Sequence, residues 1–343
     1  MTREELLRRR WGAVLPAENP TVEAAVARLT AVQAQEFSMG LLAAGLRTPG
    51  ATAASVETAL SSGVVRTHVM RPTWHLVAVE DLRWLMRLTA DRVAQAAGTM
   101  FRSLGLTPEV RAQSRNLVEK ALKDGPRTRD EVMVTVAEGG LPVDGLRPVH
   151  YLMDAELALV VCNGPRKGKT ITYDLVDRRI PAAPEVPRDE ALARLAGRYL
   201  RGHGPATDRD LSWWSGLGLT EVRRGLEGNR SWLATARPGD AEVWFDPEGK
   251  LAGLEGFGWL PAFDEALVAF ADRTAILDPE RTPQVLTQNG IFNPFVVYQG
   301  RIAGTWKRTA PGRPRVEVAW FAPPPKGAEA AQKEWEGYLE HFG

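Results

Sequence analysis

The sequence predicts an α+β fold, with three tandem winged helix-turn-helix units followed by a C-terminal antiparallel β-domain. Three observations lead to this fold class. A helical unit occurs twice with the same internal order, and a β-rich stretch follows each copy. The last quarter of the chain has a different pattern, rich in strands and turn signals. Repetition of this kind indicates repeated structural units rather than one continuous domain.

The repeated unit is clearest at residues 116–160 and 190–233. Each copy has an amphipathic helical pattern, the motif Gly-Pro-x-Thr, an acidic second helix and a third helical pattern. Thr128 and Thr207 occupy the same place in the two copies, and each has an acidic residue three positions later, as in a capping box. Both threonines are therefore expected to begin the second helix of their unit.

A predicted hairpin follows the third helix of each copy. In "LALVVCNGPRKGKTITYDLV" two apolar halves flank a basic turn, and "WLATARPGDAEVWF" has its turn at Arg-Pro-Gly-Asp. Three helices followed by a two-stranded hairpin make a winged helix-turn-helix. A generic helical domain with a hairpin attached is the alternative, and the repeated order favours the winged unit.

A more diverged copy is predicted at the beginning of the chain. Residues 21–46 have helical patterns, and residues 55–79 give a third helix and a wing that turns at Met-Arg-Pro. Residues 79–97 continue as a helix, and the Pro-rich residues 178–190 are the clearest linker. The predicted domains are winged helices at residues 1–110, 111–182 and 183–250, and a β-domain at residues 251–343.

The β-domain begins with a compact apolar segment, residues 259–277. Residues 285–309 are β-rich, with turn signals at Asn289-Gly290 and Gln299-Gly300. Residues 313–323 supply another strand, and an amphipathic C-terminal helix follows. We expect a small antiparallel sheet or barrel that this helix closes.

The composition is that of a globular protein, since 44% of the 343 residues are hydrophobic and 25% are charged. No apolar run approaches the roughly 20 residues that a membrane span requires, and the charged N-terminus lacks the apolar core of a signal peptide. The single cysteine, Cys162, excludes an internal disulfide and a multi-cysteine zinc site. We expect a cytoplasmic location and no membrane partner.

The charge balance excludes a strongly basic nucleic-acid binder, because the net charge is only +1. The first 120 residues carry 15 Lys/Arg and 11 Asp/Glu, an excess of +4 that folding could gather on one face. The five histidines show no metal-ligand spacing, and "NGPRKGKT" lacks the spacing of a phosphate loop. We therefore expect neither a metal nor a cofactor.

The most informative local motif is Gln33-Ala34-Gln35. In a helix, residues two apart point about 200° away from each other, whereas in an extended segment they project to the same side. Two amides on one side could hold a water, or grip a flipped base or sugar. Two solvent-facing or capping glutamines on a helix are the alternative.

Several longer motifs occur together in a fixed order: "RLTAVQAQ", "THVMRPTWHLVAVEDLRWL", "ATDRDLSWWSGL", "LPAFDEALVAFADR" and "NGIFNPFVVYQGRIAGTWKR". Over roughly residues 3–340 the chain resembles the AlkZ-type winged-helix DNA glycosylases. The resemblance implies a concave DNA channel between the winged helices. It also implies monofunctional hydrolysis that releases N7-alkylated purines from double-stranded DNA. Unhooking of interstrand crosslinks for antibiotic self-resistance, and a monomeric state, are further expectations.

The resemblance also assigns the catalytic residues. The family signature is Gln-apolar-Gln, which Gln33, Ala34 and Gln35 match, whereas a sister branch has Gln-apolar-Asp. Alanine is a small occupant of the middle position. Gln33 and Gln35 are expected to orient a water that attacks the sugar C1′ atom. Because N7 alkylation already activates the leaving base, a strong carboxylate base is less necessary.

Two parts of the chain are expected to meet the duplex, because linked guanines cannot flip freely into a deep pocket. One is a hairpin tip, made of Gln288, Asn289, Gly290, Ile291 and Phe292. The other is the first wing, with His68, Arg71 and Thr73 near the lesion. Candidates for phosphate contacts are Arg66, Arg71 and Lys307. Asn-Gly is also simply a good tight turn, and Trp74 and Trp306 are expected in the core.

Two rival functions remain open at the level of sequence. A non-catalytic transcriptional regulator would bind an operator and release no base, and a sequestering protein would bind the genotoxin without DNA. Winged helices alone do not decide among these functions. The Gln-Ala-Gln motif and the resemblance along most of the chain favour the enzyme.

Overall fold

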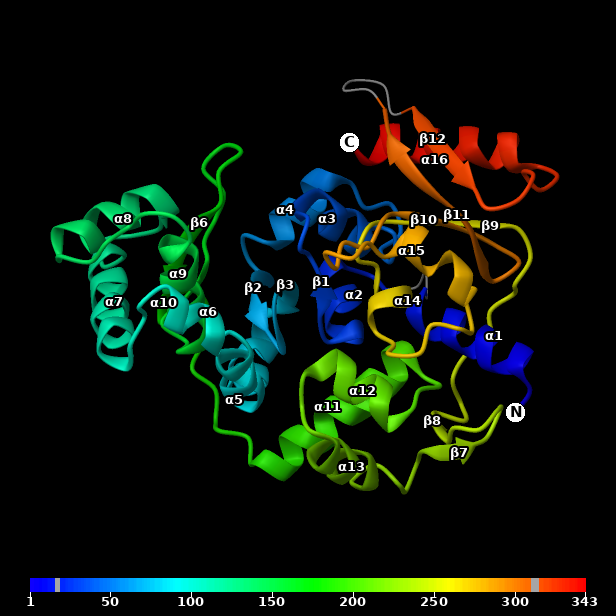
Figure 1. Ribbon diagram of the computed structural model, residues 1–343, viewed down its shortest axis with the longest axis horizontal. Helices are drawn as coiled ribbons and strands as arrows, with labels where there is room; N and C mark the ends of the chain where they lie inside the picture. The colour runs from blue at the N-terminus through cyan, green and yellow to red at the C-terminus, as the bar shows by residue number, and fades with distance from the viewer. Residues whose placement is uncertain (16–18, 310–314) are drawn as a thin grey trace.

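Three helical units, each with a small β-sheet, follow one another along the chain and lead into a C-terminal sheet (Figure 1). The computed structural model describes residues 1–15, 19–309 and 315–343. Helix α1 (Arg3–Val14) precedes the first unit. No helix in the described residues is both long and apolar enough to cross a membrane.

The first unit places a three-stranded sheet beside three short helices. Its elements are α2 (Val22–Leu29), β1 (Val32–Gln33), α3 (Phe37–Gly45), α4 (Ala53–Ala59), β2 (Val64–Val69) and β3 (Arg71–Ala78). The strands lie in the order β1-β3-β2 and are antiparallel. Met70 makes the turn between β2 and β3 with a positive φ of 63°. Helices α5 (Val79–Ala96) and α6 (Gly98–Ser103) then lead to the second unit.

The second unit repeats this order of elements. Its elements are α7 (Pro108–Ala121), β4 (Arg127–Thr128), α8 (Arg129–Glu138), α9 (Arg147–Leu157), β5 (Val161–Asn163) and β6 (Thr172–Leu175), followed by α10 (Val176–Arg179). The strand order β4-β6-β5 corresponds to that of the first unit. As predicted, Thr128 begins α8 with a capping box, in which Glu131 bonds back to the Thr128 N–H.

The third unit has the same order with a shorter first strand. Its elements are α11 (Arg188–His203), α12 (Asp208–Ser215), α13 (Leu219–Glu227), β7 (Ala234–Ala236) and β8 (Val243–Phe245). A single antiparallel bridge between Ala206 and Trp244 takes the place of the first strand, which is β1 in the first unit and β4 in the second. Thr207 caps α12 as predicted, with Asp210 completing the box.

The C-terminal part is an open, antiparallel, four-stranded sheet in the order β12-β11-β10-β9. Its elements are β9 (Phe257–Leu260), α14 (Glu265–Val268), a 3-10 turn (Pro279–Arg281), α15 (Thr282–Val285), β10 (Phe295–Tyr298), β11 (Arg301–Arg308), β12 (Val316–Trp320) and α16 (Ala328–Phe342). Trp335 of α16 stacks on Trp259 at 6.0 Å, and Trp306 is buried against it, as expected.

Two details differ from the sequence prediction for this part. The β-rich run predicted from residue 285 begins instead with the end of α15, and its first strand starts at Phe295. The Asn289-Gly290 turn lies outside the sheet, closed by one bridge between Leu286 and Phe292. The predicted turn at Gln299-Gly300 does join two strands, β10 and β11. Residues 313 and 314 of the last predicted strand lie outside the described residues.

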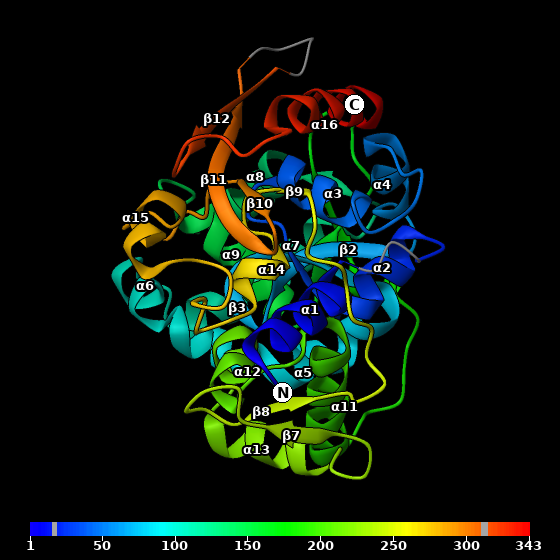
Figure 2. The same cartoon turned by 90° about the vertical axis from the view of Figure 1, so that its right-hand side faces the viewer.

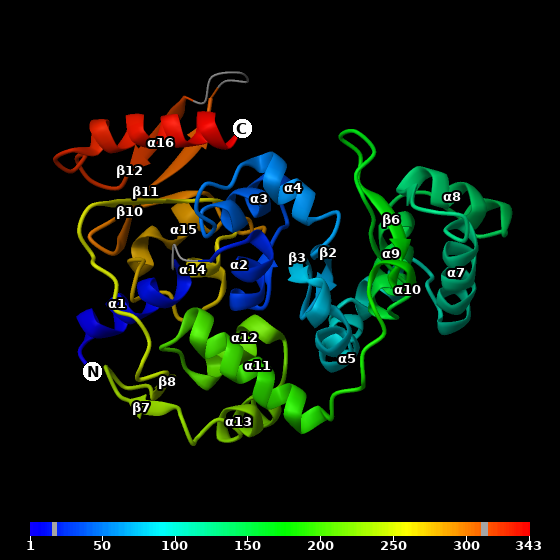
Figure 3. The ribbon, with the colours of Figure 1, turned by 180° about the vertical axis from the view of Figure 1, so that it is seen from behind.

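The first unit lies at the centre of the molecule. The second unit and the C-terminal sheet lie on different sides of it, and the third unit lies below it in the same view (Figures 1 and 3). Figure 2 shows α16 and β12 at one end of the molecule and α11 and α13 at the other. One hydrophobic cluster joins the first unit to the second and third, and another joins it to α16. The first unit, which contains Gln33, is therefore packed against the second unit, the third unit and α16.

Cys162 offers a simple test of this packing. It is fully buried in β5, and burial raises the pKa of its thiol to about 12. Because the thiolate is the reactive form, we expect an aromatic disulfide reagent to label no thiol in the native protein and one thiol in denaturant. Rapid labelling of the native protein would contradict the buried position.

Candidate active site

The Gln33-Ala34-Gln35 segment lies outside the helices: it begins in a short strand and ends in a bend at Gln35. Helix α2 ends at Leu29, and Thr30 follows with a positive φ of 68°, which turns the chain out of the helix. Gln33 then belongs to β1, and the Ala34 N–H donates to the Trp74 carbonyl at 2.7 Å. Gln33 is buried and Gln35 is exposed.

Contacts within the protein hold both glutamines. Gln33 Oε1 accepts from Arg71 Nη2 at 2.8 Å, and Gln35 Oε1 accepts from the Trp74 N–H at 3.3 Å. Each carbonyl oxygen has a second lone pair, so each can still accept a hydrogen bond from a water. The two amides therefore form a fixed, partly open polar site.

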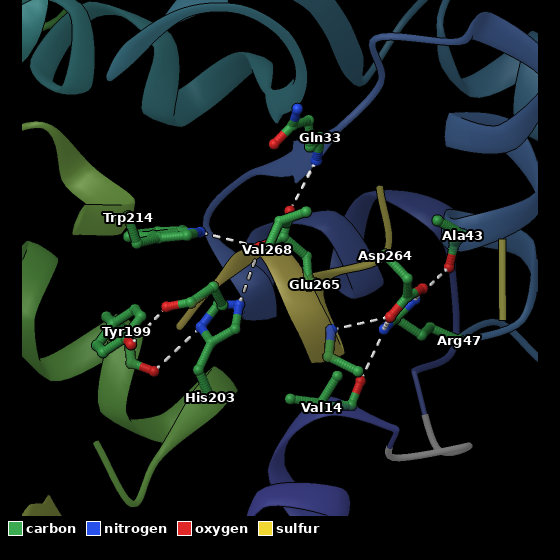
Figure 4. A network of polar contacts seen from close by, with 12 residues as sticks. Val14, Gln33, Ala43, Arg47, Tyr199, His203, Trp214, Asp264, Glu265 and Val268 are labelled. Carbon is green, nitrogen blue, oxygen red and sulfur yellow. Dashed lines mark hydrogen bonds and ion pairs between the residues drawn. The ribbon is translucent and has the colours of Figure 1, made fainter. Parts of the chain in front are cut away.

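Glu265, at the start of α14, supports the backbone of Gln33. Its Oε1 accepts the Gln33 N–H at 2.8 Å, and its Oε2 accepts the Trp214 Nε1–H at 2.9 Å (Figure 4). His203 Nε2 lies 3.4 Å from the same carboxylate, within ion-pair distance but without hydrogen-bond alignment. Burial alone would raise the pKa of Glu265, but His203 and the Gln33 amide lower it below its ordinary value. The carboxylate thus remains charged and keeps both acceptor positions.

A second buried ion pair fixes the beginning of α14. Both Asp264 oxygens accept from the Arg47 guanidinium at 2.9 Å. Arg47 also donates to the carbonyls of Val14 and Ala43, each at 2.8 Å (Figure 4). Helices α1, α3 and α14 therefore meet at one guanidinium, which determines where the neighbouring Glu265 lies.

The amino-acid sequence carries no separate signal for this support. Glu265 occurs in "FDEAL", which indicates only a capped helix start, and Asp264 does cap α14. Trp214 and His203 come from the third unit. Only the folded chain brings Glu265 to Gln33, which lies 232 residues away in the sequence.

The known proteins that this chain resembles are DNA glycosylases. A model of the family described as DNA glycosylase AlkZ-like matches residues 26–340. The chain belongs to the AlkZ-like DNA glycosylase family. An interstrand DNA cross-link repair glycosylase of Streptomyces sahachiroi is 28% identical over 320 residues, which cover 85% of this chain and 83% of that protein. The solved structure of the Streptomyces sahachiroi DNA glycosylase AlkZ matches with a TM-score of 0.82 at 23% identity, covering all of this chain and 97% of that one.

In this family member, Arg71 and Thr73 lie beside the glutamines. Arg71 bonds to Gln33, and the β1-β3 register places Thr73 on the strand that carries both partners. Burial lowers the pKa of Arg71, Glu265 raises it, and Arg273 lowers it. The guanidinium of Arg273 also lies over Trp213, whose side chain is 46% exposed. The sequence prediction names neither Arg273 nor Trp213.

Arg66 and His68 do not reach this face, contrary to the expectation that His68 lies near the lesion and Arg66 meets a phosphate. Both are buried, and the alternation of side chains along β2 places them on the face opposite Thr67. His68 Nδ1 lies 2.6 Å from Glu156 of α9, and Arg66 donates to the Ala34 carbonyl and covers Trp74. The β2-β3 hairpin is buried there because the second unit packs against it.

The hairpin tip is exposed except for one residue. Asn289, Gly290 and Ile291 are exposed, and the side chain of Ile291 is 45% exposed. Phe292 is buried, with its ring 5.7 Å from that of Phe263, so it does not fit the expected contact with the duplex. Ile291 is the apolar side chain that the tip presents. Lys307 is exposed on β11, where it pairs with Glu317 at 2.9 Å.

Proposed function

We propose that this chain hydrolyses the N-glycosidic bond of N7-alkylated purines in double-stranded DNA, including purines joined in interstrand crosslinks. The observation that carries the proposal is that the Gln33-Ala34-Gln35 segment lies outside the helices, with the Gln33 side chain held by Arg71, the Gln35 side chain by the Trp74 N–H, and the Gln33 backbone by Glu265. The name of the Streptomyces relative, a cross-link repair glycosylase, supports the crosslinked substrate.

The reaction would proceed as follows. N7 alkylation places a positive charge on the purine, so the C1′–N9 bond breaks readily and its electron pair neutralises the departing base. A water held by Gln33 and Gln35 attacks C1′, and its proton passes to solvent. The side chains named around Gln33 and Gln35 carry guanidinium groups, a carboxylate, an imidazole, indoles and a hydroxyl. None is a primary amine that would form a Schiff base, so we propose monofunctional hydrolysis.

The remaining parts of the proposal concern how DNA is held. We infer that the three units are winged helices around a DNA channel, with domain limits near residues 110, 182 and 250. The exposed residues Asn289, Gly290 and Ile291, together with Arg71, Thr73 and Lys307, are the proposed contacts. Exposure of Gln35 supports action on linked purines, which cannot enter a deep pocket. A monomer would suffice, because all the named site residues belong to one chain.

The first test is release of free base from a duplex with a single N7-methylguanine. We expect release by the wild type and a rate lower by roughly 10²–10³-fold in Gln33→Ala and Gln35→Ala, the usual cost of removing one preorganised polar group. Gln95→Ala, on the exposed surface of α5, is the matched control and should retain full activity. Equal losses in all three variants would refute the assignment of the motif.

A crosslinked duplex tests separately whether the protein unhooks interstrand crosslinks in addition to releasing N7-alkylated purines. If the crosslinked form is a substrate, the wild type should convert it to two separable strands, and the same variants should be slow. Release from monoadducts without unhooking would restrict the proposal to monoadducts.

A further inference from the structure

His75 lies directly opposite Gln33 in the register of β1 and β3. The Gln33 N–H points away from β3 to Glu265, so the two residues form a pair without mutual backbone hydrogen bonds, whose side chains approach most closely. Thr67 of β2 lies opposite His75 on its other side. All three side chains therefore project from the same face of the sheet.

The polar atoms on this face are incompletely paired. His75 Nδ1 lies 2.9 Å from the Thr73 carbonyl, which can only accept, so Nδ1 carries the hydrogen and Nε2 is an acceptor. Among the described residues, His75 Nε2 is buried without a hydrogen-bond partner, and so are the hydroxyls of Thr67 and Thr73. Buried polar atoms nearly always have partners. This acceptor and these hydroxyls, beside Gln33, therefore suit a bound water.

We propose that His75 is a positioning residue for base release, whose neutral Nε2 accepts a hydrogen bond from the water that Gln33 holds for attack. The inference rests on the function proposed above. The water donates one hydrogen to His75 and the other to Gln33 Oε1, so Gln35 binds it through its NH₂ group, and the second oxygen lone pair stays free for C1′. When the new C1′–O bond forms, the released proton passes to solvent, and His75 remains neutral.

The groups around His75 favour its neutral form, in which Nε2 can accept a hydrogen bond. Burial and then the charge of Arg71 lower the pKa of His75 to about 3, while Glu265 and the Thr73 carbonyl act in the opposite direction and His68 lowers it slightly. The imidazole is therefore neutral throughout the range in which the protein is handled. Base release should show no acid-side inflection near pH 6.5, which a general base with an ordinary histidine pKa would produce.

The experiment measures single-turnover release of N7-methylguanine and, separately, binding to a duplex whose 2′-fluoro sugar resists cleavage. His75→Phe should lower the rate constant about 10- to 100-fold and change the Kd less than twofold. His75→Gln, which restores an acceptor, should recover part of the rate. His150→Phe is the control, because His150 also bonds a backbone carbonyl through Nδ1 but lies on α9 in the second unit.

Several results would overturn the proposal: an unchanged rate in folded His75→Phe, a loss of binding equal to the loss of rate, or an inflection near pH 6.5. An atomic-resolution crystal structure gives a readout that needs no activity. A water on His75 Nε2 that is absent from His75→Phe is expected, and an apolar contact at Nε2 would refute the idea. If the wild type released no base at all, the proposed function would fail while this water site could still be seen.

Discussion

Replacing Arg47 with methionine should lower the free energy of unfolding by about 3–5 kcal/mol, the usual cost of breaking a buried ion pair from one side. Arg47 and Asp264 are both essentially inaccessible to solvent. Without the guanidinium, the Asp264 carboxylate would remain buried without its partner, and the carbonyls of Val14 and Ala43 would lose a donor. Urea unfolding followed by tryptophan fluorescence measures the change.

The matched comparison is the double variant Arg47→Met with Asp264→Leu. It removes both charges, so it should be less destabilised than Arg47→Met alone, because no unpaired charge stays buried. Arg83 pairs with Asp177, whose side chain is largely exposed, and Arg83→Met should cost less than Arg47→Met. A loss below about 1 kcal/mol in Arg47→Met, the range of exposed pairs, would show that the pair contributes little.

Local signals account for the parts of the fold that the sequence predicted well. The capping boxes at Thr128 and Thr207 lie within four residues each, and they mark equivalent helix starts in two units. The Gln-Gly pair at residues 299 and 300 likewise predicted the turn that joins β10 and β11. Such signals act over a few residues, so they can be read without knowing how the units pack.

Features that depend on distant partners could not be predicted in the same way. Whether Gln33 is extended depends on pairing with β3, whose residues lie about 40 positions later. His68 is buried because Glu156 of the second unit meets it, and Phe292 is buried because Phe263 does. The motif could therefore be recognised from the sequence, whereas the residues that support it could not.

Replacing Glu265 with glutamine should affect both the candidate site and stability. The carboxylate accepts from two N–H donors, Gln33 and Trp214, and a carboxamide has only one oxygen. One buried donor would therefore face an NH₂ group and lose its partner, which costs about 1–3 kcal/mol. Since Gln33 is on the outer edge of its sheet, loss of this acceptor loosens β1, and base release should fall at least about tenfold.

The pH dependence gives this prediction its second readout. The folded pKa of Glu265 lies below the unfolded value, so ionisation contributes stability above about pH 4.5, and that contribution is lost as the pH falls through the folded pKa. Glu265→Gln should therefore lose less stability than the wild type when both are acidified below pH 4.5. Glu280→Gln, on the exposed surface, should behave like the wild type in both assays. If Glu265→Gln kept the wild-type rate, the carboxylate would support the fold without positioning Gln33.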